Sequence, residues 1–112
     1  MKKNPVTYDQ FSALDVRVGK IVKADLVSNS KKLIRLSVDL GEDYKEATIL
    51  TGIAEFYTPS NLIGKKMLFL TNLEPKPMAG ETSHGVMLAA DIEGKPLLIE
   101  LPEDTPVGIP LK

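Results

Sequence analysis

The chain has 112 residues, 43% of them hydrophobic, and a formal net charge of −1 at pH 7, which fits one compact domain spanning 1–112. It has no cysteine and a single histidine, so disulfides, cysteine nucleophiles and thiolate or multi-histidine metal sites are excluded. It also lacks a run of about 18 apolar residues and an N-terminal secretory signal, so we expect a cytoplasmic protein without a membrane-spanning helix.

The start of the chain predicts a short helix. Thr7 and Gln10 have the spacing of a capping box, in which each side chain bonds to the backbone at the other position. Tyr8, Phe11 and Leu14 recur at helical spacing. We therefore expect these three side chains to face the core as one turn of an amphipathic helix.

The pattern then changes to the period of two that is typical of strands. Residues 16–26 predict a long first strand, in which Gly19 indicates a bulge or a sharp bend. The second strand, within LIRLSVDLG, alternates cleanly and directs four apolar side chains to one face: Ile34, Leu36, Val38 and Leu40. A third strand is predicted in EATILTGI.

A second short helix is predicted in YTPSNLIG, between the third and fourth strands. Thr58 can cap this helix, Pro59 suits its first position, and Gly64 can end it. KKMLFLTNL predicts the fourth strand and GVMLAADI the fifth, and a turn at EGK leads into a further apolar segment, PLLIEL. The last segment, PEDTPVGIPLK, has three prolines, so we expect neither a long helix nor a central strand there.

This order of elements predicts an all-β fold. Closing a small sheet into a barrel removes its unpaired edges. A bent first strand that can pair on both sides, with a helix between strands three and four, favours the five-stranded OB-fold barrel, here with a short N-terminal helix and a C-terminal extension. A small β-sandwich is the main alternative, although it fits a helix at that position less well.

An OB barrel binds nucleic acid or sugar across one face, beside the loops that follow strands one and four. Those loops here are SNSKK and EPKPMAGETSH. The first 35 residues carry eight cationic and three anionic side chains, whereas residues 36–64 carry one cation and five anions. This asymmetry suits an anionic partner, and it equally suits a solvated strand face with a basic tail.

Four segments resemble the tRNA-binding OB domain family: LDVRVGKIVKAD, KKLIRLSVDLGED, TGIAEFYTPSNLIGKKM and NLEPKPMAGETSHGVMLAA. That family includes C-terminal domains and beta subunits of methionyl-tRNA synthetases, stand-alone tRNA-binding proteins and an export-related chaperone. The resemblance covers residues 8–112. It implies a module without catalysis or cofactor, often a homodimer, that binds folded tRNA by shape and assists a methionyl-tRNA synthetase catalytic subunit.

The resemblance extends to individual residues. The motifs D-x-R-V-G, K-L, S-G, N-L-x-P-K and S-x-G are matched at Arg17, Lys32, Thr51, Asn72, Lys76, Ser83 and Gly85, with threonine replacing serine at position 51. Two cations that many members carry after the lysine of N-L-x-P-K are replaced by Pro77 and Ala79. The family usually has a methionine directly after S-x-G. This chain has Val86 at that position, and Met87 follows one place later. These departures put RNA affinity in question more than the fold.

The candidate RNA-binding residues are Arg17, Lys20, Lys32, Arg35, Thr51, Asn72, Lys76, Ser83, His84 and Met87. The lysines and arginines would contact phosphate, and about four such contacts would give a slope of log affinity against log salt of roughly −3 to −4. Exposed cations on a strand, such as Lys20 and Arg35, could equally pair with nearby acids.

Each polar loop residue has a structural alternative to an RNA contact. Asn72 could bind a base edge or a ribose 2′-hydroxyl, or it could bond to backbone at a turn. The Ser83 hydroxyl could bind phosphate or close the loop, and His84 could stack on a base or stay an exposed polar residue. Gly80 and Gly85 are expected to serve backbone geometry. Methionines such as Met87 more often pack in a core or loop.

The leading functional hypothesis is therefore a tRNA-binding protein that acts in trans with methionyl-tRNA synthetase. Two alternatives stay open: a polypeptide-binding chaperone of the same fold, and a dimerisation module for a synthetase. Catalysis is not expected, because Ser83 and His84 are adjacent in sequence and lack a third member of a triad.

Overall fold

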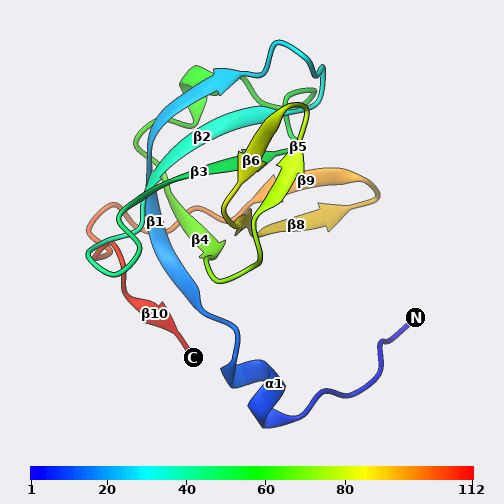
Figure 1. Cartoon of the computed structure of the whole chain (residues 1–112), viewed down its shortest axis with the longest axis vertical. Helices are drawn as coiled ribbons and strands as arrows, with labels where there is room; N and C mark the ends of the chain where they lie inside the picture. The colour runs from blue at the N-terminus through cyan, green and yellow to red at the C-terminus, as the bar shows by residue number, and fades with distance from the viewer.

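The long strand β1 (Val16–Leu26) organises the fold in the computed structural model, which describes residues 1–112 (Figure 1). Val16 and Arg17 pair with β4 (Lys66–Leu70) along one edge and with β10 (Pro110–Leu111) along the other. The second half of β1 pairs with β2 (Ile34–Asp39). All of these pairings are antiparallel, and β1 pairs on both sides as the sequence predicts.

The sheet continues outward from β1 and curls into a barrel. β2 pairs with β3 (Glu46–Thr51), and β4 pairs with β7 (Val86–Met87), which gives the strand order β3-β2-β1-β4-β7. The two ends of this path meet where the backbone N–H of His84 donates to the carbonyl oxygen of Thr48 over 2.9 Å. The predicted all-β barrel of the OB type is confirmed.

The barrel interior holds the core. Ile34, Leu36, Val38 and Leu40, which the alternation in β2 directs inward, are each at most 1% exposed. The core cluster comprises Ile21, Ile34, Leu36, Val38, Leu40, Ile49, Ile53, Leu62, Met67, Phe69 and Met87.

The expected bulge at Gly19 is wrong in position. The register shift in β1 lies between Ile21 and Lys23, so Val22 is the irregular residue. Gly19 has a different role. A Cβ atom at this position would lie 2.6 Å from Cγ1 of Val38 and 2.7 Å from Cδ2 of Phe69, so this position has no room for a side chain.

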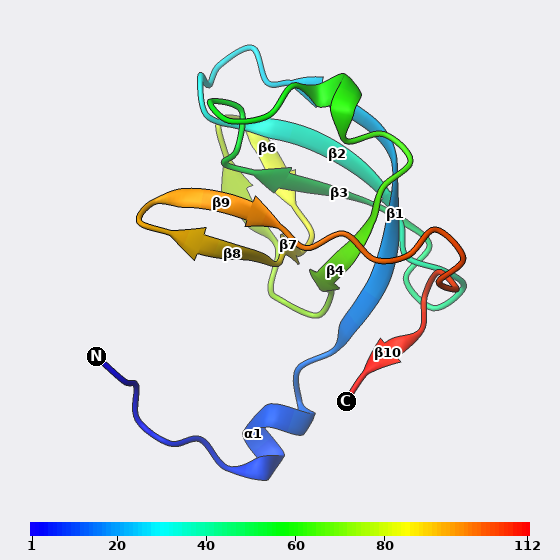
Figure 2. The same ribbon diagram turned by 180° about the vertical axis from the view of Figure 1, so that it is seen from behind.

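Both ends of the chain lie at the same end of the barrel, outside it (Figure 2). The helix α1 (Tyr8–Ser12) has the predicted capping box. The expectation that its apolar side chains face the core is wrong, because Tyr8 is 78% exposed, Phe11 49% and Leu14 52%. They line an open groove of about 440 Å³ that also includes Leu68 of β4 and Leu111 of β10.

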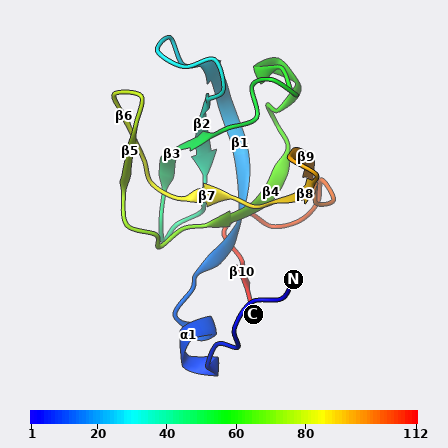
Figure 3. The same cartoon turned by 90° about the vertical axis from the view of Figure 1, so that its right-hand side faces the viewer.

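Two hairpins flank the barrel on opposite sides (Figure 3). One consists of β5 (Lys76–Met78) and β6 (Glu81–Ser83), within the segment expected to be a loop. The other consists of β8 (Ala89–Ile92) and β9 (Lys95–Leu98). The predicted fifth strand is thus split. Its first part, β7, pairs with β4, and after Leu88 the chain pairs with β9 instead.

The predicted helix between the third and fourth strands is a single 3₁₀ turn, η1 (Pro59–Asn61). Pro59 occupies its first turn as expected, but Thr58 makes no side-chain capping hydrogen bond, so that part of the prediction is wrong. Gly64 follows the turn with a φ of +88°, a conformation that favours glycine. The two helical elements, α1 and η1, have five and three residues, so neither could span a membrane.

Candidate nucleic-acid interface

The β5–β6 hairpin folds over the outer face of β2 and β3. Leu50 points outward from β3, because its register partner is the outward-facing Arg35 and the adjacent pair of Leu36 and Ile49 is buried in the core. Met78 and Ala79 of the hairpin pack on a second apolar cluster formed by Val27, Leu33 and Leu50. The hairpin therefore has its own small core, separate from the barrel interior.

Two further features hold the hairpin in place. Its turn places Ala79 at φ 50° and Gly80 at φ 82°, as a two-residue type I′ turn requires. At the base of the turn, the carboxylate of Glu81 accepts a hydrogen bond of 2.7 Å from the guanidinium of Arg35, which ties the hairpin to β2. Arg35 thus has an acidic partner on a neighbouring element, the alternative that its sequence position left open.

The S-x-G motif closes the barrel. Ser83 is 4% exposed, and its hydroxyl accepts from the backbone N–H of Leu50 and donates to the carbonyl oxygen of Gly85, each over 3.0 Å. Gly85 has a φ of +150°, and a Cβ there would lie 2.7 Å from the carbonyl oxygen of Leu70. Of the two roles considered for the Ser83 hydroxyl, these contacts correspond to closing the loop. The backbone role expected for Gly85 is confirmed.

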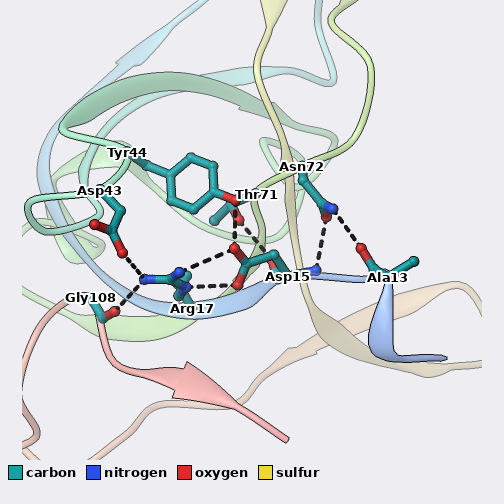
Figure 4. Close-up of polar contacts among 8 residues, drawn as sticks. All are labelled: Ala13, Asp15, Arg17, Asp43, Tyr44, Thr71, Asn72 and Gly108. Carbon is teal, nitrogen blue, oxygen red and sulfur yellow. Dashed lines mark hydrogen bonds and ion pairs between the residues drawn. The ribbon is translucent and has the colours of Figure 1, made fainter. Parts of the chain in front are cut away.

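Asn72 anchors the segment that leads into β1 (Figure 4). Its side-chain oxygen accepts from the backbone N–H of Asp15 over 2.8 Å, and its side-chain N–H donates to the carbonyl oxygen of Ala13 over 2.6 Å. The neighbouring Thr71 donates to the carbonyl oxygen of Asp15 from both its backbone N–H and its hydroxyl. The strand that leads into the candidate RNA-binding loop therefore holds the end of α1 on the barrel.

Arg17 joins three parts of the chain in the same network (Figure 4). Its guanidinium donates to the Asp15 carboxylate over 2.7 and 3.2 Å, to Asp43 over 3.0 Å and to the carbonyl oxygen of Gly108 over 3.0 Å. It also lies over the ring of Tyr44, 5.3 Å from the ring centre. With its side chain only 16% exposed, Arg17 is committed to contacts within the chain.

The charges in this network reinforce one another. The pKa of Asp15 lies below its ordinary value, because its carboxylate accepts hydrogen bonds first from Arg17 and then from the Tyr44 hydroxyl. The pKa of Arg17 is raised, mainly by its hydrogen bond to Asp15 and then by that to Asp43. Both groups therefore stay ionised at neutral pH and hold β1, the turn at 41–45 and the C-terminal segment together.

Lys32 and Lys76 are exposed and form no ion pair within the chain. Lys32 follows the loop after β1, and its carbonyl oxygen accepts a hydrogen bond from the backbone N–H of Ala54, just beyond β3. Lys76 begins β5, beside the same end of β3. These two candidate cations therefore lie at one end of the barrel, where the predicted loops meet.

Of the remaining four candidates, Thr51 and Met87 line one pocket with Lys76. Lys20 is exposed on β1 but belongs to a cross-strand row with Asp39 and Glu46, both acidic. His84 is exposed and lines a groove with Glu46 and Tyr44. Thr51 is half-buried beside Lys76, and Met87 is 7% exposed and packs in the core.

Sequence reasoning missed three contributors to this region. Asp15 and Tyr44 complete the Arg17 network, and Glu81 pairs with Arg35. The Ala79-Gly80 pair between Met78 and Glu81 could have indicated the two-residue turn of a hairpin. Asp15 is only two positions from Arg17, but no local signal could have indicated the partners Asp43 and Gly108, which are 26 and 91 positions away.

Residues 16–110 match a family model described as a putative tRNA binding domain. The match covers most of the chain and includes every strand except the last residue of β10. The chain belongs to this family. Such a tRNA-binding domain is a binding module without catalytic function.

Similar proteins place this tRNA-binding domain among those of the methionyl-tRNA synthetase type. A methionine–tRNA ligase of Methanothrix thermoacetophila is 42% identical over 109 residues, which are 96% of this chain and 16% of that protein. A crystal structure of a MetRS related protein from Pyrococcus horikoshii has a TM-score of 0.91 at 40% identity, covering 98% of this chain and 100% of that one. The chaperone CsaA from Bacillus anthracis has a TM-score of 0.85 at 25% identity, with 97% and 100% covered. The chain thus spans a small part of its curated synthetase relative and the whole length of both solved structures.

Proposed function

We propose that this protein binds folded tRNA as a homodimer and assists aminoacylation by methionyl-tRNA synthetase in trans. The observation that carries the RNA-binding part is the pair of unpartnered cations, Lys32 and Lys76, at the end of the barrel where the loop after β1 meets the β5–β6 hairpin. Arg35 lies in the same region and can exchange Glu81 for a phosphate. Three cations in one region suit contacts to the backbone of a folded RNA.

The expected salt dependence of RNA binding is weaker than the sequence alone suggests, because one candidate cation, Arg17, already forms ion pairs within the chain. Because Arg17 is engaged by Asp15 and Asp43, we count about three phosphate contacts and expect a slope of log affinity against log salt of roughly −2 to −3. We expect Lys32→Gln and Lys76→Gln each to weaken binding to bulk tRNA several-fold at low salt. Each change should make the slope less steep by about 1.

This expectation can be checked by fluorescence anisotropy with labelled tRNA over a series of salt concentrations. Lys95→Gln, on the β8–β9 hairpin at the opposite side of the barrel, removes the same charge and is the matched control. A wild-type chain that does not bind tRNA at 50 mM salt would refute the RNA-binding proposal. Equal losses in all three variants would mean that only overall charge matters.

The homodimer part of the proposal rests on the groove at the terminal end of the barrel. Seven of its nine lining residues are hydrophobic, and Tyr8, Phe11 and Leu14 leave large apolar areas exposed. Apolar patches of this kind mark protein interfaces. The groove is formed by the two ends of the chain, and a second copy that presents the same groove would bury all of it symmetrically.

We expect Leu14→Glu to weaken self-association at least tenfold, because it places a charge in the buried centre of that interface. Leu26→Glu is the matched control, since Leu26 is 61% exposed at the other end of β1 and lies outside the groove. Sedimentation velocity over a range of protein concentrations measures the effect. A wild-type chain that stays monomeric at the highest concentration would contradict the dimer.

A chaperone is the second candidate, favoured by the similarity to CsaA and by the apolar groove. It predicts suppression of client aggregation that Leu14→Glu impairs and that Lys76→Gln leaves unchanged. A pull-down from native extract that recovers a synthetase after nuclease treatment would instead support a direct protein contact with the enzyme.

A further inference from the structure

A small pocket lies between the end of β3, the β5–β6 hairpin and β7. Figure 3 shows this hairpin on the left, beside β3. Its volume is about 230 Å³. Met78 and Val86 provide apolar walls, and Gly52 lies at the end of β3. The Ser83 hydroxyl in its lining is already satisfied by contacts within the chain, so it makes no demand on a ligand.

Two polar groups of this pocket have no partner in the chain. Lys76 forms no ion pair, and the carboxylate of the hairpin, Glu81, is engaged by Arg35. The half-buried hydroxyl of Thr51 makes no hydrogen bond within the chain. The pocket therefore combines apolar walls with one cation and one hydroxyl that are available to a ligand.

This combination suits a single nucleotide better than a duplex. An apolar slot accepts the faces of an unstacked base, and a hydroxyl can bond to its edge. The cation is placed to neutralise the phosphate attached to that base. The space is too small for a base pair. Met78, which lines it, packs on the apolar cluster that includes Leu33, the residue after Lys32.

We propose that this pocket takes one unpaired base of the bound RNA, with the adjoining phosphate on Lys76. The proposal rests on the RNA-binding function above and makes it more specific: the protein recognises an unstacked nucleotide within a folded RNA, in addition to its phosphate backbone. Selectivity then depends on whether the RNA offers an unpaired base at the correct distance from the phosphates bound by Lys32 and Arg35.

Gly52 allows the pocket to be filled without disturbing the barrel. A Cβ built at this position meets no atom within 4 Å, and its backbone does not need glycine. We expect Gly52→Leu to occupy the pocket, whereas Gly52→Ala adds a single methyl group and serves as the matched control. Thermal unfolding of both variants should remain close to that of the wild type.

The test uses two RNA hairpins of equal length, one fully paired and one with a single bulged 2-aminopurine. The wild type should bind the bulged hairpin about tenfold more tightly, and 2-aminopurine fluorescence should change as the base leaves its stack for the pocket. Gly52→Leu should lose both the selectivity and the fluorescence change while it keeps the salt slope. Gly52→Ala should retain all three.

The two proposals fail in different ways. If Gly52→Leu retains the wild-type selectivity and fluorescence change, the pocket assignment is overturned and the RNA-binding function stands. If the wild type binds both hairpins equally, the pocket assignment is again overturned. If the wild type binds neither hairpin nor tRNA at low salt, both proposals are overturned together.

Discussion

Gly19→Ala is expected to lower the free energy of unfolding by about 2–3 kcal/mol, the largest single effect that we anticipate. The added methyl would lie 2.6 Å from Val38, 2.7 Å from Phe69 and 2.9 Å from Leu40, all of which are fully buried. These neighbours cannot move into solvent, so the strain falls on the centre of the barrel. Urea unfolding at a fixed protein concentration measures the loss, because dimer formation would make stability depend on concentration.

The matched control is Gly52→Ala, which adds the same methyl group where a Cβ meets no atom within 4 Å. We expect Gly52→Ala to raise the free energy of unfolding by less than about 1 kcal/mol, because alanine lowers the conformational entropy of the unfolded chain. If Gly19→Ala were equally harmless, the close contacts around Gly19 would not describe the protein in solution.

Asp15→Asn is expected to lower the free energy of unfolding by about 2 kcal/mol at pH 7, because it removes the charge-assisted hydrogen bonds that the Asp15 carboxylate accepts from Arg17 and Tyr44. Arg17 keeps Asp43 and the Gly108 carbonyl, so its charge is not left without partners. The variant should fold, with the connection between the start of β1 and Tyr44 of the turn at 41–45 weakened.

The same carboxylate predicts a specific pH dependence. The pKa of Asp15 is lowered in the folded state from an ordinary value of 3.8, so the unfolded chain binds the proton more readily. Its contribution to stability is therefore fully present above about pH 5 and is lost as the pH falls from there through the lower folded pKa. The wild type and Asp15→Asn should converge in stability on acidification. Urea unfolding at pH 7, 5, 4 and 3 checks this, and a constant difference between the two would contradict it.

Much of the barrel could be predicted because its signals are local. The alternation in β2, the turn residues around it and the proline and glycine near η1 each act over a few positions. The helical spacing of Tyr8, Phe11 and Leu14 correctly indicates an apolar stripe. This spacing does not indicate what packs on the stripe, and within one chain all three side chains remain exposed.

The candidate site was less predictable, because a motif does not distinguish a residue that binds a ligand from one that positions the site. Asn72 bonds to a backbone group 57 positions away, and Arg17 bonds to Asp43 and to Gly108, a turn and a C-terminal segment remote in sequence. Only the fold brings these partners together. Lys32 and Lys76 were named from family motifs together with Arg17, and only the structure separates the two exposed lysines from the arginine engaged within the chain.

The pairing of Val16 with Leu111 and of Arg17 with Pro110 has a consequence for biosynthesis. Because β1 is synthesised long before β10, the edge of Val16 and Arg17 that β10 covers stays open until residues 110–111 have left the ribosome. Contacts so distant in sequence require a large loss of chain entropy before they give any stabilisation, which slows folding. During that interval the nascent chain is most exposed to aggregation and most dependent on general folding factors.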